Sequence, residues 1–386
     1  MHLNIVNIIK KILGDGFHPL HEPYFCGKEW KYLRKTLDDN YVSSVGSFVN
    51  KFEEKIKRLT NAKYAISLVN GTAALHLSLI ACGVKKNDEV LVPSITFAGT
   101  ANAVTYSGAI PHFIDSEFYT LGIDPIKLEK YLDKIAIKKG KFYFNKKTNR
   151  RVSAIIPVHV FGNICQIDKI LKVARKYNLI VIEDAAEALG SFFKNKHAGN
   201  FGIAGCFSFN GNKILTTGGG GAVITNNRIL AKKIKHLSTT AKINHRWEYI
   251  HDTIGYNFRM PNLNAALGLA QIENLNRFLK SKRKLHKNYA EKFRLINSIK
   301  LIEEQKFSKS NCWLNAIIIK DSSLKKRNMI LEFGHRNKIF LRPAWKPLHT
   351  LKHFNNMPMM NLDNSIKIYE SCINLPSSAS YFYKKK

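Results

Sequence analysis

The sequence predicts an α/β fold with a mostly parallel, mixed sheet between helices, followed by a smaller C-terminal α+β domain. In the first two thirds of the chain, apolar strand patterns alternate with helical patterns, as in parallel sheets. A long helical pattern then runs from residue 262 to about residue 296 and has the length of a bridge between two domains. The 386 residues, 45% of them hydrophobic, are enough to bury two cores.

The elements follow from the hydrophobic patterns in chain order. A helix opens at residues 69–72 and stops at Gly83. The expected strands are 89–96, 154–160, 179–183 and the pair 205–209 and 221–225, with a helix at 166–177. After the long helix we expect a strand at 312–320, a helix at 325–337 and a strand starting at 340. The predicted boundaries are an N-terminal extension (1–18), a large domain (19–260) and a small domain (261–386).

The N-terminal residues 1–11 are apolar and basic but lack the features of a cleaved signal. We expect a short surface helix there. No apolar stretch approaches the roughly 18 residues of a membrane span. The six cysteines have no CxxC spacing and no histidine cluster, which argues against a disulfide framework and a metal site. These features predict a cytoplasmic protein with free thiols.

The charge is strongly basic, with 61 Lys and Arg against 28 Asp and Glu, a net charge of +33. Such a surface attracts polyanions. The lysines are spread along the chain, however, and we find no tract of interleaved aromatic and basic residues and no nucleic-acid-binding motif. We therefore expect solvated basic faces, affinity for an anionic small-molecule substrate, and no nucleic-acid partner.

Lys213 ends the segment SFNGNK, which a glycine run at 218–221 follows. A loop lysine beside glycines can approach a planar ligand closely, and a lysine that forms a Schiff base must first lose its proton. For this segment alone, a surface lysine beside a glycine-rich turn is the better interpretation.

Asp184 comes at the carboxyl end of the strand expected at 179–183, where open α/β sheets place their ligands. A buried carboxylate needs a cationic partner, and a protonated pyridine nitrogen is such a partner. A helix-capping role explains Asp184 equally well when it is considered alone.

Two further patterns suit the same kind of ligand. Gly71, Thr72 and Ala73 lie where a strand enters a helix, and the free N–H groups of a helix start hold phosphates. Ser208 can add a hydroxyl, and Phe97, at a strand end, can stack on a flat ring. Alone, an ordinary turn with a threonine N-cap and a core phenylalanine are the better interpretations.

Taken together, these patterns give the chain a specific resemblance. From about Pro19 to Pro376 it resembles the DegT/StrS-type sugar aminotransferases, which are fold type I enzymes dependent on pyridoxal 5′-phosphate (PLP). The matching stretches are NGTAAL, VPSITFAGTANAV, PVHVFG, VIEDAAEALGS, GCFSFNGNKILTTGGGG, IGYNFRMPNLNAALGLAQIENL and RPAWKPLH.

The resemblance implies roles for individual residues. Lys213 matches the PLP-binding lysine, and Asp184 matches the acid on the pyridine nitrogen. Phe97 is similar to the ring-stacking aromatic, and Glu187 stands where relatives often carry Gln or His facing the ring. The phosphate cup would consist of Gly71, Thr72, Ala73 and Ser208. Asn257 is similar to an asparagine that reaches the phosphate from the neighbouring subunit, which implies a homodimer with shared active sites.

Two stretches are similar to those that line the nucleotide-sugar site in relatives. The candidate substrate-binding residues in them are Ser44, Arg342, Trp345, Lys346 and His349. A structural tryptophan surrounded by solvated charges is a competing interpretation. His159 either lines the pocket or is a hydrogen-bonded core histidine.

The resemblance implies transfer of an amino group, from glutamate, to a 4-keto-6-deoxy sugar on UDP or GDP for surface-glycan synthesis. The motifs look closest to the legionaminic-acid and bacillosamine type. Related dehydratases carry histidine in place of the lysine, so Lys213 favours transamination. The alternatives are a PLP-dependent nucleotide-sugar dehydratase and a non-catalytic anion- or nucleic-acid-binding protein on this fold. Relatives usually continue with a terminal helix after NLPSS, so we expect weaker packing of the small domain here.

Overall fold

A mixed sheet forms the centre of the protein in the computed structural model, which describes residues 2–383. Its strand order is β1-β11-β10-β7-β6-β2-β3. Strands β10, β7, β6, β2 and β3 are parallel, whereas β11 is antiparallel to both of its neighbours. The strands are β1 (Tyr64–Leu68), β2 (Glu89–Pro93), β3 (Ile110–Ile114), β6 (Arg151–Ile155), β7 (Ile180–Asp184), β10 (Ala204–Ser208) and β11 (Gly221–Thr225). The predicted α/β class is confirmed.

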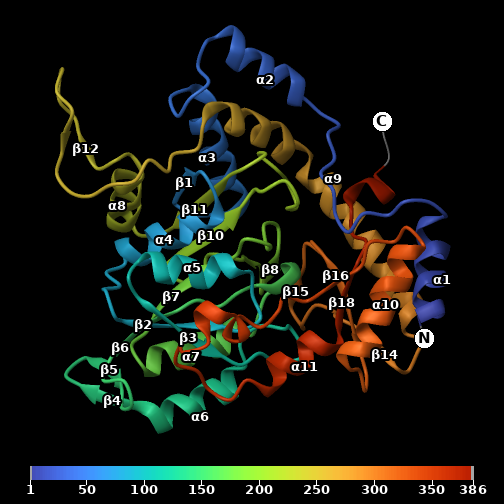
Figure 1. The fold of residues 1–386 in the computed structure, drawn as a ribbon. Helices are drawn as coiled ribbons and strands as arrows, with labels where there is room; N and C mark the ends of the chain where they lie inside the picture. Colours follow the sequence, from blue (N-terminus) through green and yellow to red (C-terminus); the bar gives the residue numbers. More distant parts are fainter. Residues whose placement is uncertain (1, 384–386) are drawn as a thin grey trace.

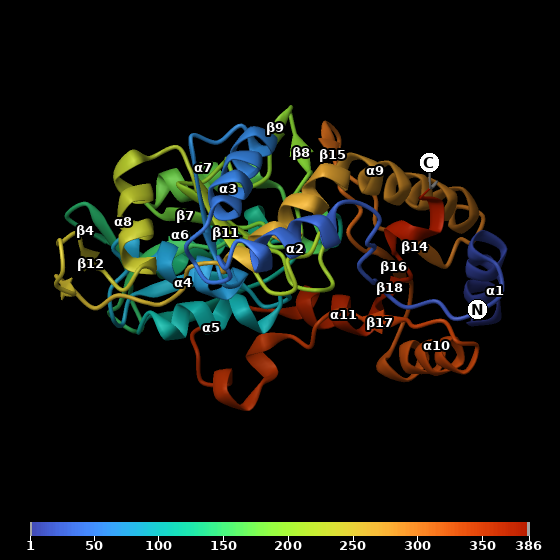
Figure 2. The same ribbon diagram turned by 90° about the horizontal axis from the view of Figure 1, so that it is seen from above.

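Helices cover both faces of this sheet. In Figure 2, α3 (Ser47–Thr60) and α7 (Ile167–Lys176) lie on one side, and α4 (Gly71–Ala81) and α5 (Ala98–Tyr106) lie on the other. Helix α7 is amphipathic and buries Ile167, Ile170, Val173 and Ala174. Helix α4 is apolar nearly all round because the sheet, α5 and α8 enclose it. The other helices of this part are α2 (Glu29–Asp38), α6 (Pro125–Ile135) and α8 (Arg228–Ser238).

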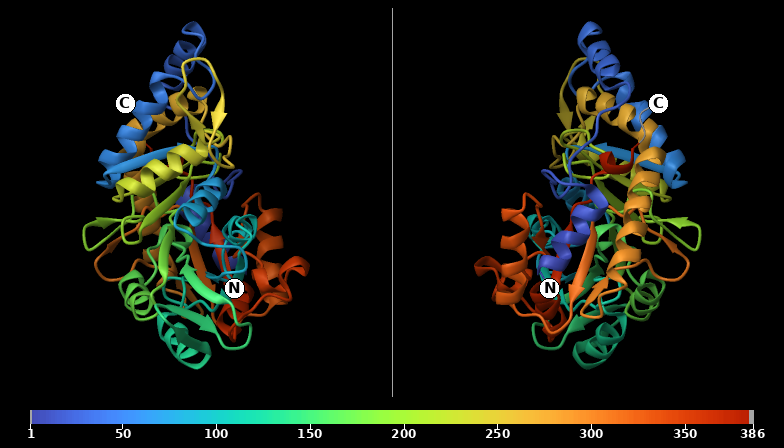
Figure 3. Two further views of the ribbon diagram at one scale, coloured as in Figure 1. Left: turned by 90° about the vertical axis from the view of Figure 1, so that its left-hand side faces the viewer. Right: turned by 90° about the vertical axis from the view of Figure 1, so that its right-hand side faces the viewer.

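The long helix α9 (Asn262–Phe293) leads from the large sheet to a second, antiparallel sheet (Figure 1). This sheet has the order β14-β16-β18-β17. The C-terminal elements, orange to red, gather to one side of the large sheet (Figure 3). They are β14 (Ile299–Leu301), β16 (Asn315–Ile319), α10 (Leu324–Arg336), β17 (Arg342–Pro343), α11 (Asp363–Ser371) and β18 (Cys372–Leu375). One face of this sheet packs in a second hydrophobic cluster that includes Ile317, Ile319 and Ile373. Ala316, Ile318, Ile368 and Cys372 instead pack in the cluster of the large sheet.

Helix α1 (His2–Leu13) belongs to this second cluster. Ile5, Val6 and Ile9 are buried in it together with Leu285 and Tyr289 of α9. The expectation of a surface helix was therefore wrong in one respect. A helix forms, but its apolar face is part of the small hydrophobic core.

A basic hairpin, β4 (Ala136–Lys139) and β5 (Phe142–Asn145), extends the amino end of β6. Arg151 lies 4.3 Å from the ring centroid of Phe142, and Lys139 lies 5.2 Å from that of Phe144. Aromatic and basic residues are thus interleaved here, and the statement that no such tract exists was wrong. The cationic groups lie over the rings, which stabilises an exposed hairpin rich in lysine.

The segment between α8 and α9 forms a projecting arm (Figure 1) that contains β12 (Lys242–Ile243) and β13 (Ile250–His251). Trp247 and Tyr249 on this arm are 70% and 79% exposed.

The remaining short strands are β8 (Phe192–Phe193), β9 (Lys196–His197) and β15 (Ser308–Lys309). The 3-10 helices are η1 (Val160–Gly162), η2 (Leu348–Thr350), η3 (Lys352–Phe354) and η4 (Ala379–Phe382). All six cysteines are free thiols, and no helix within residues 2–383 has the length and apolar character of a membrane span.

Candidate active site

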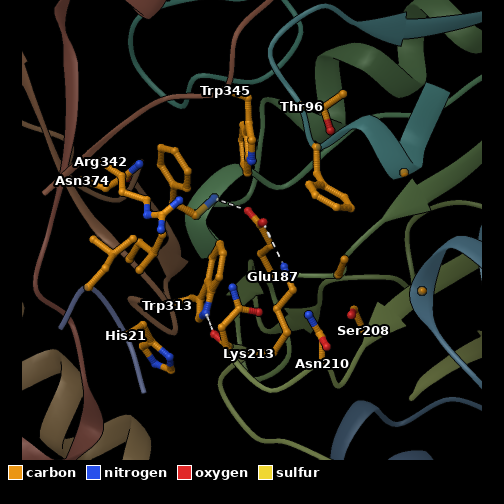
Figure 4. A pocket seen from close by; sticks show the side chains of 18 of the residues that line it. His21, Thr96, Glu187, Ser208, Asn210, Lys213, Trp313, Arg342, Trp345 and Asn374 are labelled. Carbon is orange, nitrogen blue, oxygen red and sulfur yellow. Dashed lines mark hydrogen bonds and ion pairs between the residues drawn. The ribbon is translucent and has the colours of Figure 1, made fainter. Parts of the chain in front are cut away.

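A cavity of about 920 Å³ opens at the carboxyl ends of the parallel strands, where they face the C-terminal sheet. The large sheet and its loops contribute Gly71, Thr72, Phe97, Asp184, Glu187, Ser208 and Lys213 to the lining. The N-terminal segment and the C-terminal part contribute Leu20, His21, Trp313, Arg342 and Trp345. Figure 4 shows Glu187, Ser208 and Lys213 on one side of the cavity and His21, Trp313 and Arg342 on the other.

Asp184 is the last residue of β7 and is almost completely buried. Its Oδ2 accepts a hydrogen bond from Thr100 Oγ1 at 2.7 Å, and its Oδ1 accepts one from the Ala186 N–H at 3.1 Å. Thr100 Oγ1 in turn lies 2.9 Å from Thr96 Oγ1. Burial raises the pKa of Asp184 above its usual range, while the Thr100 hydrogen bond acts against that rise. A cationic ligand group beside Asp184 would stabilise its charged form.

Lys213 lies on the loop between β10 and β11 and turns into the same cavity. Its Nζ is 3.1 Å from Glu187 Oε1 and 4.1 Å from the ring centroid of Trp313 (Figure 4). Glu187 also accepts the Phe161 N–H at 2.9 Å. Burial raises the pKa of Glu187, and the positive charge of Lys213 opposes this shift. The positive charge of Lys213 therefore stabilises the charged form of Glu187.

The start of α4 forms the floor of the cavity beside Ser208. Asn70 is extended, and its side chain accepts the Ala73 N–H at 2.7 Å, which caps the helix. A Cβ on Gly71 would lie only 3.0 Å from Ser208 Cβ, so glycine keeps this corner open. Gly71 and Thr72 line the cavity, whereas Ala73 does not, and its N–H group is bonded to Asn70. Phe97, the N-cap of α5, is 61% exposed at the rim.

Comparison with known proteins identifies the family. A model of the DegT/DnrJ/EryC1/StrS aminotransferase family matches residues 25–382. A GDP-perosamine synthase of Escherichia coli O157:H7 is 36% identical over 342 residues, 87% of each chain. The solved structure of Helicobacter pylori PseC, an aminotransferase involved in pseudoaminic acid biosynthesis, has a TM-score of 0.84 at 25% identity, covering 94% of both chains. The PLP form of a putative sugar aminotransferase from Streptococcus pneumoniae shares the fold, with a TM-score of 0.84 at 24% identity over 96% of this chain and 95% of its own.

The chain belongs to the DegT/DnrJ/EryC1/StrS aminotransferase family. It is a PLP-dependent sugar aminotransferase. The cavity fits PLP on its own chemistry, because it combines an open corner at a helix start, a buried carboxylate and a primary amine. The predictions of fold, enzyme class and cofactor are confirmed. The narrower subgroup stays a prediction, because the relative named above is a GDP-perosamine synthase rather than an enzyme of the legionaminic-acid or bacillosamine type.

In this aminotransferase the candidate substrate residues divide into two groups. Arg342 and Trp345 line the cavity, and Trp345 packs on Phe161 with ring centroids 4.9 Å apart. Three others lie outside the lining of this chain's cavity, namely Ser44, the exposed Lys346 and His349. The Nδ1 atom of His349 is 2.7 Å from Ser94 Oγ, and burial lowers the pKa of this histidine.

His159 and Asn257 are not part of the cavity lining either. His159 Nε2 lies 2.9 Å from Glu183 Oε2, and both side chains are fully buried. His159 is thus a hydrogen-bonded core histidine and does not line the pocket. Asn257 is exposed, follows the projecting arm and pairs with Thr239 in an isolated bridge.

The cavity residues that escaped the sequence analysis include Thr100, Trp313 and His21. Thr96 precedes the N-cap of α5 and Thr100 lies in the first turn of this helix, and their hydroxyl oxygens are 2.9 Å apart. A threonine at the end of the expected strand and another at the following helix start were a usable signal. Trp313 and His21 are brought to Lys213 from distant parts of the chain, and no local pattern indicated either residue.

Proposed function

We propose that this enzyme transfers an amino group from an amino-acid donor, glutamate, to the 4-keto group of a nucleotide-linked 6-deoxy sugar in surface-glycan synthesis. The observation that supports this most directly is the meeting of Lys213, Asp184 and the start of α4 in one cavity. When bound, PLP supplies an aldehyde and an electron-withdrawing ring. The remaining chemistry falls to side chains of this cavity.

Lys213 is the proposed catalytic residue. Its amine would hold the cofactor covalently, and the freed Nζ would take up the proton from the donor Cα and return a proton during amination of the sugar. Glu187 holds Nζ at 3.1 Å and keeps the side chain at the centre of the cavity. One side chain thus serves as base and acid in both half-reactions.

Asp184 and the start of α4 would orient the cofactor from its two ends. The Asp184 carboxylate would keep a ring nitrogen protonated, since a cation beside it offsets the cost of burying its charge. Gly71, Thr72 and Ser208 would hold the phosphate at the helix start. Phe97, at the rim, would cover one face of the ring.

The substrate would reach the cofactor along the side of the cavity that carries Arg342 and Trp345. A guanidinium suits a diphosphate, and an indole suits a sugar or a base. We further infer that Asn257 acts on the site of a second copy, whereas Ser44, Lys346 and His349 remain candidates for binding the nucleotide sugar. The exposed arm at 242–254 and the position of Asn257 outside its own cavity support a homodimer with shared sites.

The decisive experiment combines an absorbance spectrum of the protein with PLP and an analysis of the reaction product. Purified protein mixed with PLP should turn yellow, and Lys213→Ala should not form the same absorbing species. Holoenzyme with glutamate should then aminate a 4-keto-6-deoxy sugar, with GDP-linked and UDP-linked N-acetyl forms tested side by side by mass spectrometry. Loss of a sugar hydroxyl without use of glutamate would instead indicate a dehydratase. Salt-sensitive nucleic-acid binding without colour would indicate an anion-binding protein.

A further inference from the structure

Trp313 contacts the proposed catalytic lysine although it forms no part of the cofactor-binding pattern described above. The Lys213 Nζ lies over its indole ring at 4.1 Å from the centroid, while Glu187 Oε1 lies 3.1 Å from the same nitrogen (Figure 4). A cation over an indole face is stabilised by the ring quadrupole, most strongly where water is scarce. Lys213 is only 12% exposed, and Trp313 is buried.

Asn311 links the backbones of Glu187 and Trp313, the two residues whose side chains contact the Lys213 amine. Asn311 Nδ2 donates to the Glu187 carbonyl at 2.7 Å, while Asn311 Oδ1 accepts the Trp313 N–H at 2.9 Å. Cys312 has a φ of +51°, a left-handed conformation that is uncommon for residues other than glycine. This turn directs the indole into the cavity, and one asparagine links it to Glu187.

The indole is also tied to the lysine loop itself. Trp313 Nε1 donates to the carbonyl of Asn212, the residue before Lys213, at 2.7 Å. The ring therefore lies in a fixed place beside the lysine rather than in a mobile contact. Such a fixed, desolvated aromatic face is suited to a charged side chain that returns repeatedly to one position.

The charged groups that line the cavity with Lys213 are two carboxylates and one cation, the Arg342 guanidinium. Glu187 and Asp184 supply negative charge. His21 lies on Trp313 with ring centroids 6.3 Å apart, and burial together with Lys282 and Lys213 keeps the pKa of His21 well below its usual range. His21 is therefore uncharged near neutral pH and does not compete with the lysine. Lys282 is fully buried and likewise holds its proton weakly, with a pKa lowered by burial to about 7.

We propose that the Trp313 indole and the Glu187 carboxylate form a holding site for the Lys213 ammonium whenever that side chain is not bonded to the cofactor. Trp313 is then a positioning residue. It keeps the freed amine in the cavity and stabilises the protonated form, which must give up its proton before it can bond to the cofactor again. This inference rests on the proposed role of Lys213.

The test is the rate at which cofactor-free enzyme captures PLP, followed by absorbance from pH 6 to pH 10. Only the uncharged amine attacks the aldehyde, so the midpoint of the rate profile reports the balance between charged and uncharged amine. Removing the indole in Trp313→Leu should move the midpoint down by about 0.5 to 1 pH unit, which means about 3- to 10-fold faster capture near pH 7. Glu187→Gln should move it in the same direction.

Trp313→Phe separates the ring face from the Nε1 hydrogen bond, because phenylalanine retains a face but has no donor. We expect an intermediate midpoint. If the hydrogen bond to Asn212 were all that mattered, Phe and Leu would behave alike, and the inference would fail. Trp30→Leu is the matched control, since Trp30 is 85% exposed and lies outside the cavity lining. Its profile should coincide with that of the wild type.

The outcomes separate this inference from the function on which it rests. An unchanged midpoint in Trp313→Leu, with or without a lower plateau, would overturn the holding site alone. Should Trp313→Leu fail to fold, the midpoint of Trp313→Phe decides in its place. If wild-type protein captured no PLP, or if Lys213→Ala captured it equally well, the proposed function itself would fail.

Discussion

Thr100 shows how a single hydroxyl can set the working pH of this site. Its hydrogen bond to Asp184 lowers a pKa that burial raises, so the carboxylate retains more of its charge at neutral pH. In Thr100→Val the pKa of Asp184 should rise further. The acid limb of the kcat/KM profile should then move to higher pH, because a protonated Asp184 cannot hold the ring nitrogen's proton.

The size of the effect follows from the bond that is lost. A hydrogen bond to a charged group contributes about 1.5–3 kcal/mol, so kcat/KM at pH 7 should fall roughly 10- to 100-fold in Thr100→Val. Thr100→Ser keeps the donor and should retain most of the activity. An acid limb at the wild-type position in the valine variant would contradict the role assigned to Thr100.

Asp184 itself can be tested by removing its charge. Asp184→Asn keeps the shape and the Thr100 contact but cannot stabilise a protonated ring nitrogen. We expect kcat to fall by at least about 100-fold, the scale of a lost charge at a reacting centre, while the protein still binds PLP with altered absorbance. A kcat close to that of the wild type would exclude the assignment of Asp184.

At this scale the sequence was informative only where a residue belongs to a local pattern. Lys213 and Asp184 stand in motifs next to strand ends, and the structure places both in one cavity. Trp313 lies 100 residues beyond Lys213 and follows an unusual backbone turn at Cys312, so only the folded chain reveals the contact. The predicted roles of the cofactor- and substrate-binding residues remain to be tested.

At the scale of the elements, helix α9 places a lysine side chain, Lys282, in the protein interior. Lys282 is fully buried, donates a hydrogen bond to the Ser377 carbonyl, and has a pKa lowered by burial to about 7. In the unfolded chain the same group has a pKa near 10.4. Between pH 7 and pH 10 the unfolded state therefore binds more protons at this site, and the contribution of Lys282 to stability rises with pH.

The variant Lys282→Met should remove this dependence. The free energy of unfolding of this variant, measured with urea, should exceed that of the wild type. The difference should be largest at pH 7, on the order of 3–5 kcal/mol, and smallest at pH 10. Lys280→Met, on the exposed side of the same helix, serves as the control. A wild-type–variant difference that stays constant across this range would show that Lys282 does not titrate there.

The predicted helices and strands agree best with the structure where a single hydrophobic pattern dominates the segment. The strand at 221–225 and the long helix from Asn262 lie where they were expected. The strand expected at 154–160 is instead β6 (Arg151–Ile155). Pro157 lacks an N–H for a sheet ladder, and the chain enters the turn η1 soon after it. The hairpin of β4 and β5 was overlooked because its lysines mask the alternation of a short strand.

At the scale of the whole molecule, the proposed sharing of active sites predicts that two inactive variants recover activity when they are mixed. If Asn257 completes the cofactor site of a second copy, Lys213→Ala and Asn257→Ala each lose activity for a different reason. Mixed under conditions that exchange subunits, the two variants should regain about a quarter of wild-type activity, because half of the dimers are mixed and each has one intact site. Continued inactivity in mixtures that demonstrably exchange would argue against sharing.

The N-terminal segment ties the two hydrophobic cores to each other and to the cavity. His18 pairs with Ile339 in a parallel bridge, and the Ser377 N–H donates to the Leu20 carbonyl at 2.7 Å. These contacts place Phe17, Leu20 and His21 in the cavity wall. During translation this stretch is made more than 300 residues before its partners at residues 339 and 377. The wall of the cavity can therefore close only after residue 377 has been synthesised, and until then the apolar face of α1 lacks its packing partners.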